Sequence, residues 1–317
     1  MHISYYMYHL EFNANYGTIG QRNRAGALLR ITFEDGLVGY CDCHPWIELG
    51  DLPLSKQLLA LYHSSSTPLL NCSLLFARID AQARQHKRSL FEGLEIPPSH
   101  QLVSLSDDIA PFTADEITFF KIKSGNQPEE EIKTLSSWIS DHPQIKLRLD
   151  FNEKLSRNEF LYYWKSVPES VKQCIDFIED PYKYEPDYYT EDQEQLDISF
   201  AVDKSSEKAL EFPQSAEVIV HKPAVDLPPK FSSSNTKLVV TTYLDHPFGQ
   251  MCAAYAAATL KAQYPSQIHC CGLLSHKCYQ GDSFIQSVQS SGPNLIPSKG
   301  TGFGFDELLK EVPWQSL

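Results

Sequence analysis

The chain has 317 residues, 42% of them hydrophobic and 21% charged, a composition typical of a globular protein with one large domain or two ordinary ones. Its formal net charge of −13 disfavours nucleic acid and anionic membranes as partners, and no apolar run in the sequence approaches the length of a membrane span. The first residues alternate like a strand and lack the basic start and apolar block of a signal peptide, which predicts a cytoplasmic protein.

Residues 1–95 predict an α+β domain. Two strand-like runs within 27–43 are joined by Asp35 and Gly36, a dipeptide typical of tight hairpins. Helical stretches are expected at about 53–63 and 68–88, where apolar residues recur with helical spacing. We expect the tail 275–317 to pack back on this domain, and a second domain to occupy 96–274.

Eight cysteines are scattered along the chain, and in a cytosolic protein of this length we expect them to be reduced. The segment CDCH at 41–44 could hold a soft metal, but no second cluster follows at the spacing of a zinc site. Because this segment follows GLVGY, we interpret it as the end of a buried strand.

From about residue 100 onward, short apolar runs alternate with polar segments that are compatible with helices. The clearest helices are predicted at about 128–140, 157–166 and 249–262. Eight strands alternating with helices are typical of a (β/α)₈ barrel, and an open doubly wound sheet is the competing arrangement. The eight apolar runs lie at 102–106, 117–123, 145–150, 174–179, 198–203, 216–222, 236–242 and 267–272.

Five consecutive apolar runs end in charged side chains. In a barrel of parallel strands these ends meet at one rim, where active sites are built, whereas an open sheet would spread them along a longer line. The pattern therefore favours a barrel with a site at that rim. The charged residues are, in order, Lys121 with Lys123, Asp150, Glu179, Asp203 and Lys222.

Three convergent carboxylates, those of Asp150, Glu179 and Asp203, are best stabilised by a cation. Oxygen ligands without His or Cys favour a hard ion, Mg²⁺ or Mn²⁺, with open positions for water or substrate oxygens. Lys121 and Lys123 alternate along one strand and so point to the same side of it. The positive charges of Lys121 and of the ion would favour the neutral amine of Lys123, as a general base requires.

Several motifs resemble those of the enolase superfamily, and within it the muconate-lactonizing-enzyme subgroup, over nearly the whole chain. The segments KIK, RLDFN, IEDP and VHKPA resemble the motifs of its second, third, fourth and sixth barrel strands. AVDKS departs from the family's Asp-Glu-Ser at Lys204, and Asp42 stands where the family usually has Glu. The Lys-Pro pair, RLDFN and the C-terminal GTGFGF are most similar to the o-succinylbenzoate synthases.

This resemblance implies a modified (β/α)₈ TIM-type barrel with an N-terminal α+β capping domain, and an enzyme acting on a small-molecule carboxylate. It implies that Mg²⁺, held by Asp150, Glu179 and Asp203, binds a substrate carboxylate while Lys123 removes the proton from the adjacent carbon to give an enediolate. For the o-succinylbenzoate synthases the reaction is a syn dehydration in menaquinone biosynthesis, a lyase reaction. Lys222 would remain a cation over the π-system, and Lys121 would complete the catalytic lysines.

Four further residues are candidates for substrate binding: Arg148, Asn152, Arg22 and Arg24. Arg148 shares the inward face of its strand with Asp150, and would bind a carboxylate oxygen or pair with Glu179. Asn152 would support the metal ligands. Arg22 and Arg24 match the position of the capping loop that closes over the substrate in the family, and their charges suit an anionic succinyl tail.

His246 follows the seventh run and resembles the His base of the mandelate racemase branch, but it precedes Pro247 and Lys222 already occupies the opposing position. We therefore predict a loop or helix-cap role for His246. Two other functions remain open. One is racemisation of an N-acyl amino acid or epimerisation of a dipeptide with the same two lysines, and the other is a non-catalytic barrel that binds carboxylates. The intact acid triad and both lysines argue against the latter, and the sequence does not determine the oligomeric state.

Overall fold

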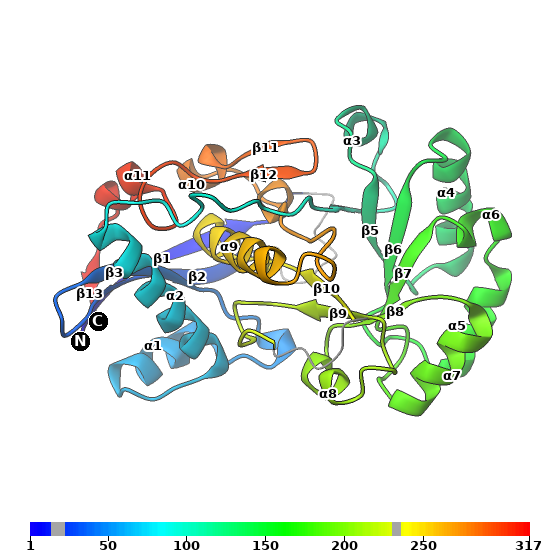
Figure 1. Cartoon of the computed structure of the whole chain (residues 1–317), viewed down its shortest axis with the longest axis horizontal. Helices are drawn as coiled ribbons and strands as arrows, with labels where there is room; N and C mark the ends of the chain where they lie inside the picture. The colour runs from blue at the N-terminus through cyan, green and yellow to red at the C-terminus, as the bar shows by residue number, and fades with distance from the viewer. Residues whose placement is uncertain (14–22, 230–235) are drawn as a thin grey trace.

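The computed structural model describes residues 1–13, 23–229 and 236–317, and it places an antiparallel N-terminal sheet beside a curled parallel sheet surrounded by helices (Figure 1). Both chain ends lie on the outer side of the N-terminal sheet, away from the barrel helices. None of the helices within the described ranges is long and apolar enough to cross a membrane.

The N-terminal sheet has the strand order β13-β1-β2-β3, and all its pairs are antiparallel. The Asp35–Gly36 hairpin joins β2 to β3 as predicted, and Gly36 has a φ of 81°, which side chains with a Cβ rarely adopt. The CDCH segment begins as the end of β3, with both cysteines buried, so this prediction is confirmed. The strands are β1 (His2–Glu11), β2 (Asn23–Thr32), β3 (Val38–Cys43) and β13 (Gln315–Ser316).

Two helices cover this sheet close to where the sequence predicts them, α1 (Leu54–Tyr62) and α2 (Pro68–Gln85). The hydroxyl of Thr67 caps α2 by accepting the backbone N–H of Leu70. The helix packs so tightly on β3 that a Cβ at Gly39 would lie 1.9 Å from the carbonyl oxygen of Ala77. Glycine at this position therefore permits the close packing of helix on strand.

Seven parallel strands form the barrel sheet in the order β10-β9-β8-β7-β6-β5-β4, so each strand pairs with its neighbour in the sequence. The helices predicted from the sequence are present as α4, α5 and α9, whereas α3, α6, α7 and α8 were not singled out. The strands are β4 (Gln101–Val103), β5 (Phe119–Lys123), β6 (Lys146–Asp150), β7 (Ile175–Glu179), β8 (Phe200–Val202), β9 (Val218–His221) and β10 (Lys237–Val240). The helices are α3 (Ala110–Ala114), α4 (Pro128–Asp141), α5 (Arg157–Ser166), α6 (Glu169–Lys172), α7 (Pro186–Leu196), α8 (Ser206–Glu211) and α9 (Pro247–Gln263).

The eighth predicted strand, 267–272, does not form a ladder, and this part of the prediction is wrong. Its residues make single parallel bridges instead, Ile268 and Gly272 to β10 and its end, and Cys271 to Ser99 before β4. No two consecutive residues pair with the same neighbour, so a strand is not continuous here. The segment nevertheless connects the two edge strands and closes the barrel.

The C-terminal segment returns from the barrel to the N-terminal sheet (Figure 1). Arg84 of α2 holds it through Asp306, at 2.5 Å, and the carboxylate of Asp80 accepts the backbone N–H of Phe303. The predicted boundaries near 95 and 274 stay a prediction. The C-terminal segment contains η3 (Ser275–Cys278), α10 (Ser283–Ser287), β11 (Gln289–Ser291), β12 (Asn294–Ile296) and α11 (Asp306–Glu311), and the remaining short element, η2 (Ile47–Leu49), follows β3.

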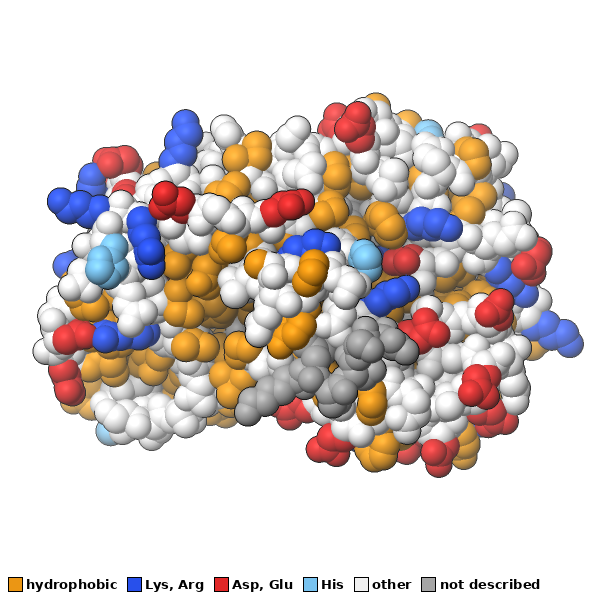
Figure 2. Space-filling view, viewed as in Figure 1, with side chains coloured by type: hydrophobic (Ala, Val, Ile, Leu, Met, Phe, Trp, Pro, Cys, Tyr) orange, Lys and Arg blue, Asp and Glu red, His pale blue; other side chains and the backbone are white. Residues whose placement is uncertain are grey.

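Charge is distributed unevenly over the visible face of the molecule. Figure 2 shows acidic side chains scattered over the outer helices of the barrel, and hydrophobic side chains gathered over the N-terminal part. The lysines predicted for the site, by contrast, lie at the ends of the barrel strands.

Candidate active site

The charged residues predicted at the strand ends lie side by side at one rim of the barrel. The pairing register sets Lys123 opposite Asp150 and Asp150 opposite Glu179. Asp203 follows β8, and Lys222 follows β9 directly. Because the strands are parallel and consecutive, three carboxylates stand on β6 to β8 with a lysine-bearing strand on either side.

Lysine ammonium groups and carboxylates form a continuous network at this rim. Lys121 Nζ donates to both carboxylate oxygens of Glu179, at 2.7 Å each, and lies 2.9 Å from Asp150 Oδ2. Lys123 Nζ lies 2.5 Å from the same Asp150 oxygen, and Lys222 Nζ lies 2.5 Å from Asp203 Oδ2. Each predicted lysine therefore contacts at least one predicted metal ligand.

Burial and neighbouring charges shift the pKa values of these groups in opposite directions. Burial favours neutral Lys121, but the carboxylates of Asp150, Glu179 and Asp203 outweigh it and raise the pKa of Lys121. Burial, with repulsion from Asp150 and Asp203, raises the pKa of Glu179 to about 8. Burial also opposes the charge of Asp150, yet Lys121 and Lys123 hold the pKa of Asp150 well below its usual range. The three acids therefore repel one another strongly enough to need nearby positive charge.

The donor chemistry of these acids fits a hard divalent cation. As the side chains stand, no three His, Cys, Asp or Glu residues of the described ranges are grouped to hold a metal ion, and the lysines supply the positive charge. Three carboxylates on adjacent strands, with mutual repulsion at Glu179, nevertheless form the all-oxygen donor set that Mg²⁺ prefers. Their role as metal ligands stays a prediction.

Asn152 lies beside Asp150, as expected for a residue that supports it. Its backbone N–H and side-chain amide both donate to Asp150 Oδ1, at 3.1 and 2.8 Å. Its amide oxygen lies 3.3 Å from Lys123 Nζ, and its left-handed backbone, with φ at 51°, turns the side chain back toward the strand end. Asn152 therefore fixes the orientation of Asp150 and also lines the cavity described below.

Asp180 has a structural role that the sequence analysis missed, although it lies in the IEDP motif. Its carboxylate accepts the backbone N–H groups of Asp203 and Lys204, both at 3.1 Å. Burial and the charges of Asp203 and Asp150 raise the pKa of Asp180 to about 7. Its position next to Glu179 in the motif was the available signal, and the structure shows that it anchors the loop carrying Asp203.

Lys204 carries the extra positive charge that departs from the family pattern. Its ammonium donates to the backbone carbonyl of Asn152 at 2.6 Å and lies 3.5 Å from Glu153. The Lys204 ammonium therefore links the loops after β6 and β8 instead of pairing with the adjacent Asp203.

The strand ends open into a cavity of about 1100 Å³ between the barrel and the N-terminal domain. This volume suits a small-molecule ligand. The wall from the N-terminal domain includes Arg24, Trp46 and Glu48, and the barrel contributes Lys121, Lys123, Asn152, Asp203, Lys204 and Lys222.

Arg24 lies at the cavity wall, but its charge already has a partner. Its Nη1 donates to Glu48 at 2.7 Å, and its guanidinium carbon stacks 3.6 Å from the centre of the Trp46 ring. The buried Nε and Nη2 atoms have no hydrogen-bond partner among the residues that the structure describes. Arg22, the other candidate in this segment, lies outside the described residues.

Arg148 does not pair with Glu179, so that alternative is wrong. Its Nε donates to Asp176 at 2.8 Å, and the oxygens of Glu179 accept hydrogen bonds from Lys121 instead. The Arg148 side chain is 3% exposed and is absent from the cavity wall, where substrate binding was expected to place it.

His246 caps a helix, which confirms the prediction for this residue. Its Nδ1 accepts the backbone N–H of Phe248 at 3.1 Å at the start of α9. The ring is buried between Tyr8 and Phe284 and lines no part of the large cavity. The ring is therefore enclosed by other side chains and does not reach the large cavity, where a catalytic base would have to act.

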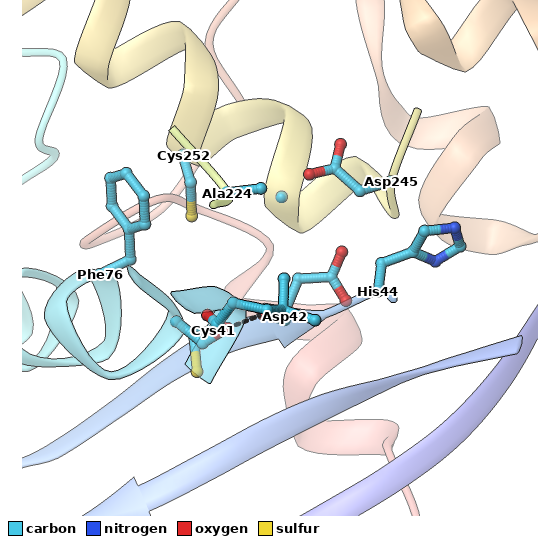
Figure 3. A pocket seen from close by; sticks show the side chains of 10 residues that line it. Cys41, Asp42, His44, Phe76, Ala224, Asp245 and Cys252 are labelled. Atoms are coloured by element: carbon cyan, nitrogen blue, oxygen red, sulfur yellow. Dashed lines mark hydrogen bonds between the residues drawn. The ribbon is translucent and has the colours of Figure 1, made fainter. Parts of the chain in front are cut away.

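A second cavity, of about 20 Å³, lies between β3 and α9. Figure 3 shows the carboxylates of Asp42 and Asp245 facing the same space. Asp42 accepts hydrogen bonds from the Tyr8 hydroxyl, at 2.6 Å, and from the backbone N–H of His246, at 3.0 Å. Burial raises the pKa of Asp42 to about 7, and burial together with the Asp42 charge raises the pKa of Asp245. The two domains therefore meet at a pair of acids that disfavour simultaneous ionisation.

Comparisons with known proteins agree with this arrangement. The family described as O-succinylbenzoate synthase, N-terminal domain, matches residues 3–83. An o-succinylbenzoate synthase from Bdellovibrio bacteriovorus is 34% identical over 306 residues, which cover 93% of this chain and 92% of the relative.

Solved structures with the same fold include a dipeptide epimerase from Enterococcus faecalis V583 complexed with Mg and the dipeptide L-Leu-L-Tyr, with a TM-score of 0.73 and 16% identity over 96% of this chain and 98% of that one. The muconate lactonizing enzyme from Pseudomonas putida has a TM-score of 0.70 and 16% identity over 98% of both chains. These likenesses show that the chain shares their fold, a barrel with an N-terminal domain. With the identity to the Bdellovibrio relative over nearly the full length, the chain belongs to the o-succinylbenzoate synthase family of lyases.

Proposed function

We propose that this chain is a Mg²⁺-dependent o-succinylbenzoate synthase that removes water from a succinyl-hydroxycyclohexadiene carboxylate in menaquinone biosynthesis. The observation that carries the proposal is the arrangement of Lys123 and Lys222 on strands to either side of three adjacent carboxylates. The identity to the Bdellovibrio enzyme supports the choice of reaction.

Lys123 is the base in this proposal. Its side chain is 31% exposed at the cavity wall, more open than Lys121, so it can reach a substrate carbon. It takes the proton from the carbon beside the carboxylate, and in a syn elimination the hydroxyl leaves from the same face. The ammonium that forms can return its proton to the hydroxyl as the carbon–oxygen bond breaks, and water leaves.

Lys222 acts from the opposite side as a permanent cation. Burial opposes its charge, but Asp203 outweighs it and raises the pKa of Lys222, so the ammonium persists at neutral pH. The ammonium also lies 5.9 Å from the centre of the Tyr243 ring, which helps to orient it. A fixed cation there stabilises the negative charge that develops on the enediolate.

Asp150, Glu179 and Asp203 would hold the Mg²⁺, which supplies positive charge next to the substrate carboxylate when it is bound. Lys121 holds Asp150 and Glu179 together, Asn152 orients Asp150, and Asp180 fixes the loop of Asp203. These three residues would keep the acids in place during the reaction.

A second candidate function is racemisation or epimerisation of an N-acyl amino acid or dipeptide, favoured by the position of the two lysines on opposite sides and by the likeness to a dipeptide epimerase. The deciding experiment incubates the enzyme with Mg²⁺ and the cyclohexadiene substrate and follows formation of o-succinylbenzoate. Parallel reactions with N-succinyl amino acids in heavy water follow exchange of the α-proton. Exchange without any aromatic product would reject the synthase in favour of the racemase.

A further inference from the structure

The buried contact between Arg148 and His100 determines which ring nitrogen of this cavity-lining histidine carries the proton. Arg148 Nη1 lies 2.8 Å from His100 Nδ1, and His100 lines the cavity. A guanidinium can only donate hydrogen bonds, so Nδ1 must be the acceptor. A neutral His100 ring therefore carries its proton on Nε2.

Arg148 is itself held rigidly, which fixes this tautomer. Its Nε donates to Asp176 at 2.8 Å, and Nη1 also donates to the backbone carbonyl of Cys270 at 3.1 Å. The rings of Phe119 and Phe177 flank the guanidinium carbon at 5.0 and 4.7 Å. Burial, followed by the charge of Arg148, holds the pKa of His100 well below its usual range, in agreement with a neutral ring.

The Nε2 atom of His100 lies beside the backbone of Gly272, and both residues line the cavity. A Cβ at Gly272 would lie 2.8 Å from His100 Nε2 and 2.9 Å from Thr241 Cγ2, too close for any side chain, so glycine leaves this edge of the ring uncovered. Among the described residues, the His100 ring makes its hydrogen bond through Nδ1. The Nε2–H group is therefore a donor that the cavity wall offers to a ligand oxygen.

His100 and the acids lie on different strands of the barrel. The carboxylates stand at the ends of β6, β7 and β8, in the middle of the strand order, whereas His100 precedes the edge strand β4. The barrel closes at this edge through Ser99, Cys271 and Gly272. A substrate whose ring carboxylate faces the acids would therefore meet His100 with another of its polar groups.

We propose that His100 is a substrate-binding residue whose Nε2–H donates a hydrogen bond to an oxygen of the substrate's acyl side chain, and that Arg148 is a positioning residue that fixes the required tautomer. The identity of the acyl chain as a succinyl group rests on the proposed function. His100 transfers no proton in this role, because its ring remains neutral and its Nδ1 is occupied by Arg148.

Two substitutions of His100 separate the two ring nitrogens. The amide nitrogen of Gln in His100→Gln can reach the place of Nε2, whereas that of Asn in His100→Asn reaches only the place of Nδ1. Calorimetric titration should show o-succinylbenzoate binding roughly tenfold or more weakly to His100→Asn, as expected for one lost hydrogen bond, and close to normally to His100→Gln. Benzoate, which lacks the acyl chain, should bind both variants as it binds the wild type. His63→Asn, at an exposed histidine, is the matched control.

The tautomer can be read directly in the ligand-free protein by ¹⁵N spectra of the histidine rings. We expect a proton on Nε2 of His100 in the wild type, a mixture of tautomers in Arg148→Met, and partial recovery in Arg148→Lys. A wild-type proton on Nδ1, or unchanged o-succinylbenzoate affinity in His100→Asn, would overturn the proposal. Equal loss of benzoate affinity would overturn the assignment to the acyl chain. If the wild type binds o-succinylbenzoate but forms none from the substrate, the proposed function fails while the tautomer and affinity results still decide the role of His100.

Discussion

Lys121 on β5 binds Glu179 on β7 through both carboxylate oxygens, at 2.7 Å each, and β6 lies between the two strands. Both side chains are buried, and Lys121 also lies 2.9 Å from Asp150. The ammonium therefore compensates the charge of two predicted metal ligands at once. A divalent ion bound by the same acids would share this task with Lys121.

Replacing Lys121 by Met should make the folded protein depend on Mg²⁺. Loss of one partner from a buried ion pair costs about 3–5 kcal/mol, because the remaining charge is uncompensated. Mg²⁺ should restore more of this stability in Lys121→Met than it adds to the wild type, as measured by thermal unfolding with and without the ion. Lys133→Met, at an exposed lysine of α4, is the control. Equal shifts for all three proteins would mean that the ion binds elsewhere.

The two lysines that flank the acids should respond differently to arginine. Lys123→Arg should be inactive, because arginine keeps its proton and cannot act as the base. Lys222→Arg should retain activity, since Lys222 only has to remain a cation, whereas Lys222→Ala should lose about 2 kcal/mol of transition-state stabilisation.

Initial rates of o-succinylbenzoate formation and α-proton exchange in heavy water distinguish the two functions. In a racemase, Lys222→Arg would be inactive toward at least one enantiomer. Dehydration by Lys123→Arg but not by Lys222→Arg would show that the base is Lys222.

Asp203→Asn should weaken metal binding and activity together. The amide removes one negative oxygen from the donor set and also leaves Lys222 without its 2.5 Å carboxylate partner. Mg²⁺ titration calorimetry should show the lost affinity, and higher Mg²⁺ should recover part of the rate. Asp197→Asn, at an exposed position after α7, should behave like the wild type. Full activity of the wild type in excess chelator would contradict the metal requirement.

Arg24→Ala should raise KM more than it lowers kcat. Arg24 lines the cavity from the N-terminal domain, and two of its nitrogens have no hydrogen-bond partner among the described residues. Its loss should therefore remove binding that is common to substrate and transition state. Steady-state kinetics test this, with Glu48→Gln as a variant that keeps the arginine but neutralises its partner. A loss confined to kcat would mean that Arg24 acts on the chemical step instead.

The stability of the protein should depend on pH through Asp42. Its folded pKa of about 7 is above the usual value of 3.8, so the folded state binds a proton that the unfolded chain has already released. The stabilisation is complete below about pH 4 and is lost as the pH rises to about 7, by at most ~1.4 kcal/mol per pH unit.

Asp42→Asn lacks this loss, and it also removes one cause of the raised pKa of Asp245, so its stability relative to the wild type should increase with pH across this window. Urea unfolding at pH 5, 6, 7 and 8 measures the difference, with Asp197→Asn as the control. Parallel curves for Asp42→Asn and the wild type would contradict the raised pKa.

Local patterns made the architecture predictable. The Asp35–Gly36 turn depends on two adjacent residues, and the five charged strand ends follow from residues within each strand. The strand predicted at 267–272 was wrong for a different reason. An apolar run in the sequence does not reveal whether the strands beside it are long enough to pair with it continuously.

Contacts between distant residues could not be read from the sequence. Strand alternation gives the face of the sheet on which Arg148 lies, but its pairing with Asp176 and His100 depends on which distant groups the folded barrel brings within reach. His100 itself was missed, since only the closure of the barrel brings it beside Gly272.

The pairing of β13 with β1 affects the order in which the protein can be assembled during synthesis. Barrel strands pair with their sequence neighbours, so much of the barrel can form while the chain is still being made. Ser4 and Tyr5 at the edge of β1, in contrast, lack their strand partners until residues 315–316 have left the ribosome. Until then the growing chain exposes a strand edge that could pair with other chains, which makes this edge the expected site of chaperone protection or aggregation during translation.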